Sequence, residues 1–128
     1  MAFFHAPDDA AALAVRGVPL VLECPPGLAG ILAEVERFLT DRDDVDVLGD
    51  ERHLAVISEV DLFALGDSVT TVTDSLRDAL VAADAPVLAA AVGHWPIAGE
   101  LAMVARAAAG AGGRVYVVSS WQGGPDGR

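Results

Sequence analysis

The sequence has no lysine, no asparagine and only one cysteine among its 128 residues. This cysteine, Cys24, cannot form a disulfide within the chain, and we therefore expect a reducing, cytoplasmic environment. Aromatic residues make up 5% of the chain, which leaves few rings for stacking on nucleic-acid bases. An apolar run of ~20 residues is missing, as is a basic start followed by an apolar core, so neither a membrane span nor a signal peptide is predicted.

Positive charge is also scarce. Eight arginines stand against 19 acidic residues, and the net charge is −11. Because phosphates bind clustered cations, this balance argues against nucleic acid or an anionic membrane as a partner, whereas a basic protein partner fits it. A GC-rich genome or a salt-loving host would also account for the composition.

The hydrophobic content of 53% is typical of a globular chain and not of a disordered one. A chain of this length is one domain by the usual expectation, and it has no internal repeat or linker. We expect a single α+β domain over residues 1–120 and a flexible, glycine- and proline-rich tail over residues 121–128.

Apolar periodicity predicts alternating strands and helices along the chain. A short helical stretch is expected, which Pro7-Asp8-Asp9 opens and which runs through Leu13. The main order is then a strand at Val18–Cys24, a helix over residues 28–39, a hairpin of strands Asp44–Leu48 and His53–Val60, a helix from Asp67 or Ser68 to Asp84, and a strand at Val87–Val92. This is the order of a ferredoxin-like βαββαβ fold. The helix over residues 28–39 has the cleanest apolar stripe, and we expect it to pack against the first strand through Ile31, Leu32, Val35 and Phe38.

A C-terminal helix and strand extend that order. Apolar residues recur at helical spacing from Ile97 to Ala108, and Gly110–Gly113 ends the helix because glycine adopts the left-handed conformation that a C-terminus often needs. Residues 115–118 are β-branched or aromatic and predict a strand. If this strand and Val87–Val92 lie parallel in one sheet, the crossover between them is right-handed. Ala89-Ala90-Ala91, however, favours a helix in place of the strand at Val87–Val92.

Residues 41–52 are strongly charged, with six acids and two arginines. The stretch does not match a calcium-binding loop that starts at Asp44, because Ala55 stands at the twelfth position, where a bidentate glutamate is required. We predict a solvated hairpin edge that binds a basic partner, with a tryptophan as anchor. The predicted partner-binding residues are Asp41, Asp43, Asp44, Asp46, Asp50, Glu51 and Trp121.

The sequence contains no motif that indicates a catalytic site. Cys24 stands before a helix N-terminus, where a thiol can be activated, but neither a second cysteine nor a histidine lies near it in sequence. We interpret it as a buried, inert cysteine. His5, His53 and His94 lack metal-ligand spacing, and Gly110–Gly113 closes a helix whereas a phosphate loop opens one. The prediction is no catalytic residue, no metal and no cofactor.

The turn Gly93-His94-Trp95 is an alternative site. It precedes a predicted helix, and a helix N-terminus can hold an anion. In this interpretation the chain is a small-ligand-binding regulatory domain of ferredoxin-like type, with His94 and Trp95 as ligand-binding residues. A tryptophan there is equally typical of a lid packed on the core.

Three segments together resemble a known class of proteins. They are Val18–Leu22 with Pro25 before a helix that ends Glu36-Arg37-Phe38-Leu39, then Leu48-Gly49-Asp50, then Gly99–Ala105 followed by Gly112-Gly113-Arg114-Val115. Through them the chain resembles small actinobacterial immunity-type proteins of polymorphic-toxin systems, which neutralise toxins by binding them. The resemblance implies a binder and no catalytic residues.

The leading hypothesis is a non-enzymatic, cytoplasmic protein-binding domain, an immunity protein that neutralises a toxin by occlusion. The ligand-binding domain is the alternative, and an enzyme that uses Cys24 with a histidine brought near by folding is a third hypothesis. A flat acidic face would favour the first, a closed pocket at His94 the second, and a short distance from Cys24 to a histidine the third.

Overall fold

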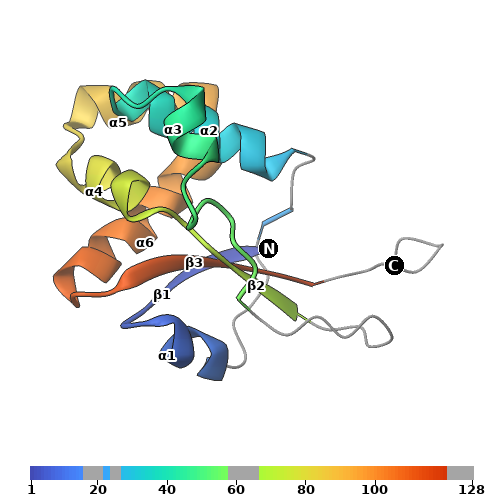
Figure 1. Cartoon of the computed structure of the whole chain (residues 1–128). Helices are drawn as coiled ribbons and strands as arrows, with labels where there is room; N and C mark the ends of the chain where they lie inside the picture. Colours follow the sequence, from blue (N-terminus) through green and yellow to red (C-terminus); the bar gives the residue numbers. More distant parts are fainter. Residues whose placement is uncertain (16–21, 24–26, 58–66, 121–128) are drawn as a thin grey trace.

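The structure, a computed structural model, describes residues 1–15, 22–23, 27–57 and 67–120. Within these residues three strands form one antiparallel sheet in the order β1-β3-β2 (Figure 1). β1 is Ala2–Ala6, β2 is Asp67–Thr71 and β3 is Arg114–Ser120. The last strand of the described chain is thus the central one, between a strand from the start of the chain and one from its middle.

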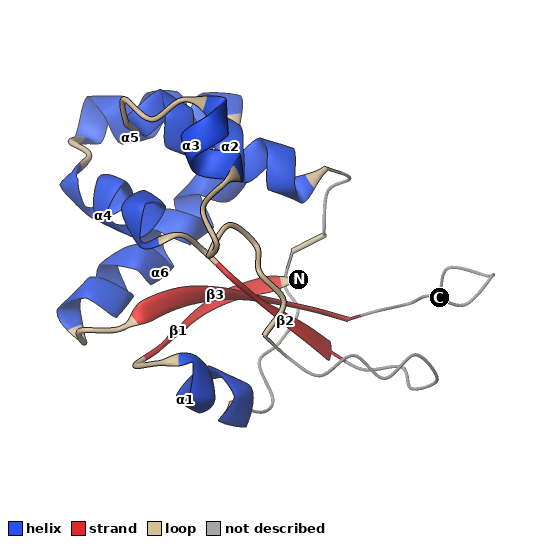
Figure 2. Cartoon of the chain, in the orientation of Figure 1, coloured by secondary structure: helices blue, strands red, loops and turns tan. Residues whose placement is uncertain are grey.

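Six helices accompany the sheet in the described part of the chain, and none of them is long and apolar enough to span a membrane. Figure 2 shows α1 on one side of the sheet and the other helices on the opposite side. The predicted α+β class is confirmed. The helices are α1 (Asp9–Ala14), α2 (Leu28–Leu39), α3 (Asp44–Leu48), α4 (Asp74–Ala82), α5 (Ala85–His94) and α6 (Ile97–Gly110).

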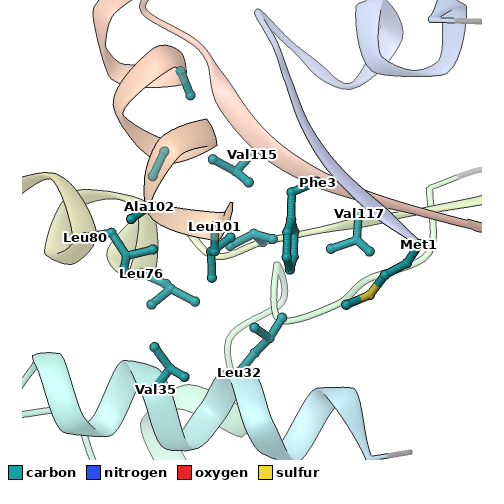
Figure 3. Close-up of a cluster of buried hydrophobic side chains, with 13 residues drawn as sticks. Met1, Phe3, Leu32, Val35, Leu76, Leu80, Leu101, Ala102, Val115 and Val117 are labelled. Atoms are coloured by element: carbon teal, nitrogen blue, oxygen red, sulfur yellow. The ribbon is translucent and has the colours of Figure 1, made fainter. Parts of the chain in front are cut away.

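The main hydrophobic core lies between the sheet and helices α2, α4 and α6 (Figure 3). Val115 and Val117 of β3 and Leu101 of α6 are each at most 1% exposed. Because side chains alternate along a strand, Tyr116 belongs to a second, smaller core on the other face, where its ring stacks on Phe4 with centroids 5.5 Å apart. α1 covers this smaller core. Each fully buried Val or Leu stabilises the fold by roughly 1.5–3 kcal/mol.

Several predicted elements are confirmed. The helical stripe over residues 28–39 forms α2, the spacing from Ile97 forms α6, residues 115–118 lie in β3, and the short helix at Asp9 forms α1. α6 ends in the predicted glycine turn, where Gly112 has a φ of 70°. Gly113 is required for a different reason, since a Cβ there would lie 2.7 Å from the backbone oxygen of Ala6.

The ferredoxin-like order is not confirmed. The described sheet has three strands, and all its pairings are antiparallel. The predicted strand Val87–Val92 is wrong, because these residues belong to helix α5, so they cannot supply the parallel partner considered for β3. β1, which the short apolar start of the chain forms, pairs with β3 instead.

Residues 44–48 form helix α3 and not the predicted strand. The Asp43 carboxylate accepts a hydrogen bond from the backbone N–H of Asp46 at 2.9 Å, and the Asp46 side chain accepts one from the backbone N–H of Asp43. This reciprocal capping box satisfies two donors of the first turn. The alternating Asp-Val-Asp-Val pattern suggests a strand, but these local hydrogen bonds favour the helix.

The expected hairpin is therefore wrong as well. Val56 forms an isolated antiparallel bridge with Thr70 of β2, and the backbone N–H groups of Leu54 and Ile57 donate to the carbonyls of Thr71 and Val69. Residues 58–60, the end of the predicted return strand, lie outside the described residues.

Two further elements differ from prediction. The expected helix start at Asp67 or Ser68 is wrong, since residues 67–71 form β2 and α4 begins only after Thr73, whose hydroxyl accepts from the backbone N–H of Leu76 at 3.1 Å. Residues 85–94 form α5, which Asp84 caps through a bond from Val87 N at 3.0 Å. Pro86 fits the first turn and the alanines favour a helix.

The packing of α2 is partly as predicted. Leu32 and Val35 are buried and Ile31 is half-buried, but Phe38 is 43% exposed, so its expected burial is wrong. The predicted strand Val18–Cys24 lies mostly outside the described residues. Leu22, which is described, packs against the main core.

Candidate functional site

Five of the six predicted acidic residues lie exposed on and around α3. They are Asp41, Asp43, Asp44, Asp46 and Glu51. Asp44 pairs with Arg37 of α2 at 3.0 Å, with both side chains about half exposed. Exposed ion pairs of this kind contribute little to stability and remain accessible to a partner. The region therefore presents negative charge to solvent.

Asp50 has a different, internal position. Its carboxylate accepts a hydrogen bond from the Arg42 guanidinium at 3.1 Å and another from the backbone N–H of Arg52 at 2.9 Å. The side chain is 23% exposed. Asp50 thus fixes the chain after α3, and its carboxylate is engaged within the protein.

Apolar side chains stand among these acids. Val45 is 80% exposed and Leu48 is 57% exposed, and their three-residue spacing puts both on the same side of α3. Val47 is fully buried. The strand interpretation does not reveal this pair, since a strand would place Val45 and Val47 together on one face. We call the group Asp43, Asp44, Val45, Asp46 and Leu48 the α3 surface.

Arg42 links the α3 surface to helix α2. Its guanidinium donates to the carboxylate of Glu36 at 2.6 Å and to the backbone oxygen of Asp46 at 2.8 Å. Glu36 is fully buried in α2, and it also accepts a hydrogen bond from the hydroxyl of Thr73, the cap of α4. A buried carboxylate persists only when it is paired and hydrogen-bonded, which both partners provide.

Arg52 fixes the other end of residues 42–52 in a similar way. Its guanidinium makes two hydrogen bonds to Asp9 of α1, at 3.0 and 3.2 Å, and lies 5.9 Å from the ring centroid of Tyr116. The Tyr116 hydroxyl donates to the same carboxylate at 2.7 Å. Hydrogen bonds from Arg52 and Tyr116 lower the pKa of Asp9. The ends of residues 42–52 are therefore both fixed by arginine.

Burial and the hydrogen bond to Asp9 raise the pKa of Tyr116 to about 12. Tyr116 is the only tyrosine in the chain, so its ionisation can be followed by ultraviolet absorbance without overlap from another tyrosine. We expect a midpoint near 12 in the folded protein and about 10 in urea. A folded-state pKa above the unfolded one gives stability that is complete below pH ~10 and lost as the pH rises toward 12. Ionisation at about pH 10 in the folded protein would contradict the burial of Tyr116 and its hydrogen bond to Asp9.

A second group of side chains lies between α2 and α5. The rings of Phe38, His94 and Trp95 have centroid distances of 5.4 to 6.1 Å, and the indole N–H of Trp95 donates to Glu34 at 3.2 Å. His94 is exposed and Trp95 is half-buried at the end of α5. The fold thus brings His94 and Trp95, which the sequence predicts to lie in a turn, together with Phe38. The apolar stripe of α2 predicts Phe38 to lie in the core.

Among the described residues, His5 and His53 take no part in either group. Trp121 and Cys24 lie outside the described residues. His5 is exposed on β1, and His53 bonds the backbone oxygen of Ala29 at 3.0 Å. Among the described residues no three His, Cys, Asp or Glu side chains are grouped so that they could hold a metal ion.

Comparisons of the chain with protein-family models, with curated proteins and with solved structures found no match. The site must therefore be judged by its own chemistry. Exposed acids and an exposed apolar pair lie together on α3, an arrangement suited to recognition of another protein.

Proposed function

We propose that this chain is a non-enzymatic, cytoplasmic protein-binding domain whose α3 surface binds a basic protein partner. The observation that carries the proposal is the exposure of Val45 and Leu48 on the same short helix as exposed aspartates. Exposed acids alone are accounted for by solubility. An exposed apolar pair beside these acids adds the water-excluding contact that a binding surface needs.

The two kinds of side chain have different roles in binding. The acids attract a basic patch from a distance and so raise the association rate, while burial of Val45 and Leu48 lengthens the lifetime of the complex. Arg42 and Arg52 hold the segment in place before binding, which limits the entropy lost when the complex forms.

The resemblance to immunity-type proteins makes a toxin the proposed partner. In such a complex the domain acts by occlusion: it covers a basic region of the toxin that would otherwise meet its own target. Occlusion needs no catalytic group on this chain, only a surface of matching charge and shape.

The proposal is tested with the purified product of the gene adjacent to the one that encodes this chain. We expect a stoichiometric complex whose dissociation is about ten-fold faster when Val45 and Leu48 are both replaced by serine. Val56→Ser is the matched control, because Val56 is 54% exposed on the segment beside β2, away from α3, and its loss should change nothing. Absence of a complex, or equal dissociation rates for parent and double variant, would contradict the proposal.

A further inference from the structure

Helix α5 is unusually apolar for its position. Residues 85–93 carry no charged side chain, although the chain as a whole has a net charge of −11. Ala91 is the one residue of α5 that is fully buried, and Val87 is 40% exposed. Leu88 packs against the main core, and the side of α5 that includes Val87 and Ala90 remains exposed to water.

Local interactions stabilise α5 as a helix. The Asp84 carboxylate accepts from the backbone N–H of Val87 at 3.0 Å, and the backbone N–H of Trp95 donates to the carbonyl of Ala91 at 2.8 Å. Alanine has the highest helix propensity, and Pro86 occupies a position where its missing N–H costs nothing. The exposed surface is therefore a formed helix.

One strip of α5 continues onto α2. Val87, Ala90 and His94 are spaced by three and four residues and so lie on one side of the helix, and the His94 ring is 6.1 Å from the ring of Phe38 on α2. Phe38 is itself 43% exposed and 5.5 Å from Trp95. We call this group, Phe38, Val87, Ala90, His94 and Trp95, the α5 patch.

The charges that adjoin the α5 patch are acidic or neutralised. Glu34 holds the Trp95 indole at 3.2 Å on one side. Arg37, next to Phe38 in α2, is paired with Asp44 of the α3 surface at 3.0 Å. The α5 patch and the α3 surface thus both adjoin the C-terminal end of α2, and of the two only the α3 surface carries a group of acids. A partner that covers both must carry apolar residues beside cations.

We propose that the α5 patch docks the apolar side of a basic amphipathic helix of the protein partner, whose lysines or arginines then lie over Glu34 and the α3 surface. This inference rests on the function proposed above and adds the second half of its surface. Two neighbouring helices with an apolar strip between them are suited to receive a third helix. A second copy of the chain is disfavoured because each copy carries a net charge of −11, and an anionic membrane is disfavoured for the same reason.

A synthetic peptide of about 18 residues, with leucines along one side and lysines along the other, is the probe. Its matched control peptide has glutamine in place of every leucine and the same charge. Binding of each is measured by nuclear magnetic resonance, with the backbone amides and the Trp95 indole as reporters. The variants are Val87→Gln combined with Ala90→Gln, both at exposed positions, and Val56→Gln as the matched surface control. Thermal melting of each variant checks that it is folded.

The leucine peptide should shift the amides of α5 and the Trp95 indole together with those of α3, and it should bind the double variant at least about five-fold more weakly than the parent or Val56→Gln. The glutamine peptide should shift α3 alone. If the leucine peptide shifts α3 but leaves α5 unmoved, or binds no better than the glutamine peptide, the inference is wrong while the acidic surface stands. If neither peptide binds, the inference and the proposed function both fail.

Discussion

Replacement of Glu36 by alanine is expected to lower the free energy of unfolding by about 3 kcal/mol, at the lower end of the range for breaking a buried ion pair. The change removes the carboxylate that Arg42 and the Thr73 hydroxyl both need. The Thr73 hydroxyl, in a residue that is 2% exposed, then lacks its hydrogen-bond acceptor. Arg42 retains its ion pair with Asp50, which limits the loss of stability.

Urea unfolding of the parent and of Glu36→Ala measures this loss. Glu34→Ala is the matched control, since Glu34 is an exposed acid on the same helix whose hydrogen bond with Trp95 lies at the surface. Its removal should cost less than about 1 kcal/mol. Losses of similar, small size in both variants would mean that the Glu36–Arg42–Thr73 network does not hold α3 against α2 and α4.

A second pair of variants separates the buried charge from the shape of the site. Replacing Glu36 and Arg42 together by methionine removes both charges and keeps most of the volume, and such replacements are often neutral or stabilising. We expect this double variant to be more stable than Glu36→Ala. It should still bind a basic partner less well, because Arg42 no longer holds the backbone of Asp46 in place.

The sequence predicts well those elements whose periodicity spans several turns. α2 and α6 each carry an apolar stripe over at least three turns, and the glycines after α6 predict where that helix ends. In β3, Val115-Tyr116-Val117-Val118 favours a strand whatever surrounds it. These elements can be predicted without knowledge of what they pack against.

Periodicity fails for short elements whose local caps outweigh the pattern of apolar residues. Asp43 and Asp46 form a capping box, a signal three residues apart that is present in the sequence but lies within an alternating, strand-like pattern. Asp84 followed by Pro86 and a run of alanines is likewise a helix start. In both segments the capping residues, and not the periodicity, carry the signal for a helix.

The topology and half of the candidate site could not be predicted in this way. Which strands pair is decided by packing between distant residues, as when β1 lies against β3 over a sequence separation of more than a hundred residues. Phe38 has the spacing of a core residue but is exposed. Its exposure could not be predicted, because a helical stripe does not show where the neighbouring helix ends. The acids are exposed as a group, as predicted, but the internal position of Asp50 depends on Arg42 folding back to Glu36.

The largest functional effect is expected when three exposed acids are neutralised together. The variant Asp43→Asn, Asp44→Asn, Asp46→Asn removes three negative charges from the α3 surface and retains the capping oxygens, since asparagine caps a helix about as well as aspartate. Its melting temperature should therefore stay close to that of the parent. The lost Arg37–Asp44 pair is exposed and contributes little.

The most direct test of the acidic binding surface is the rate of association with a basic partner, the product of the adjacent gene, by stopped flow at low and high salt. If the acids steer the encounter, the triple variant should associate about ten-fold more slowly than the parent at ~0.01 M salt. The difference should nearly vanish at ~1 M salt, and the dissociation rates should remain similar. Equal association rates for parent and variant at both salt concentrations would contradict a binding role for the α3 surface.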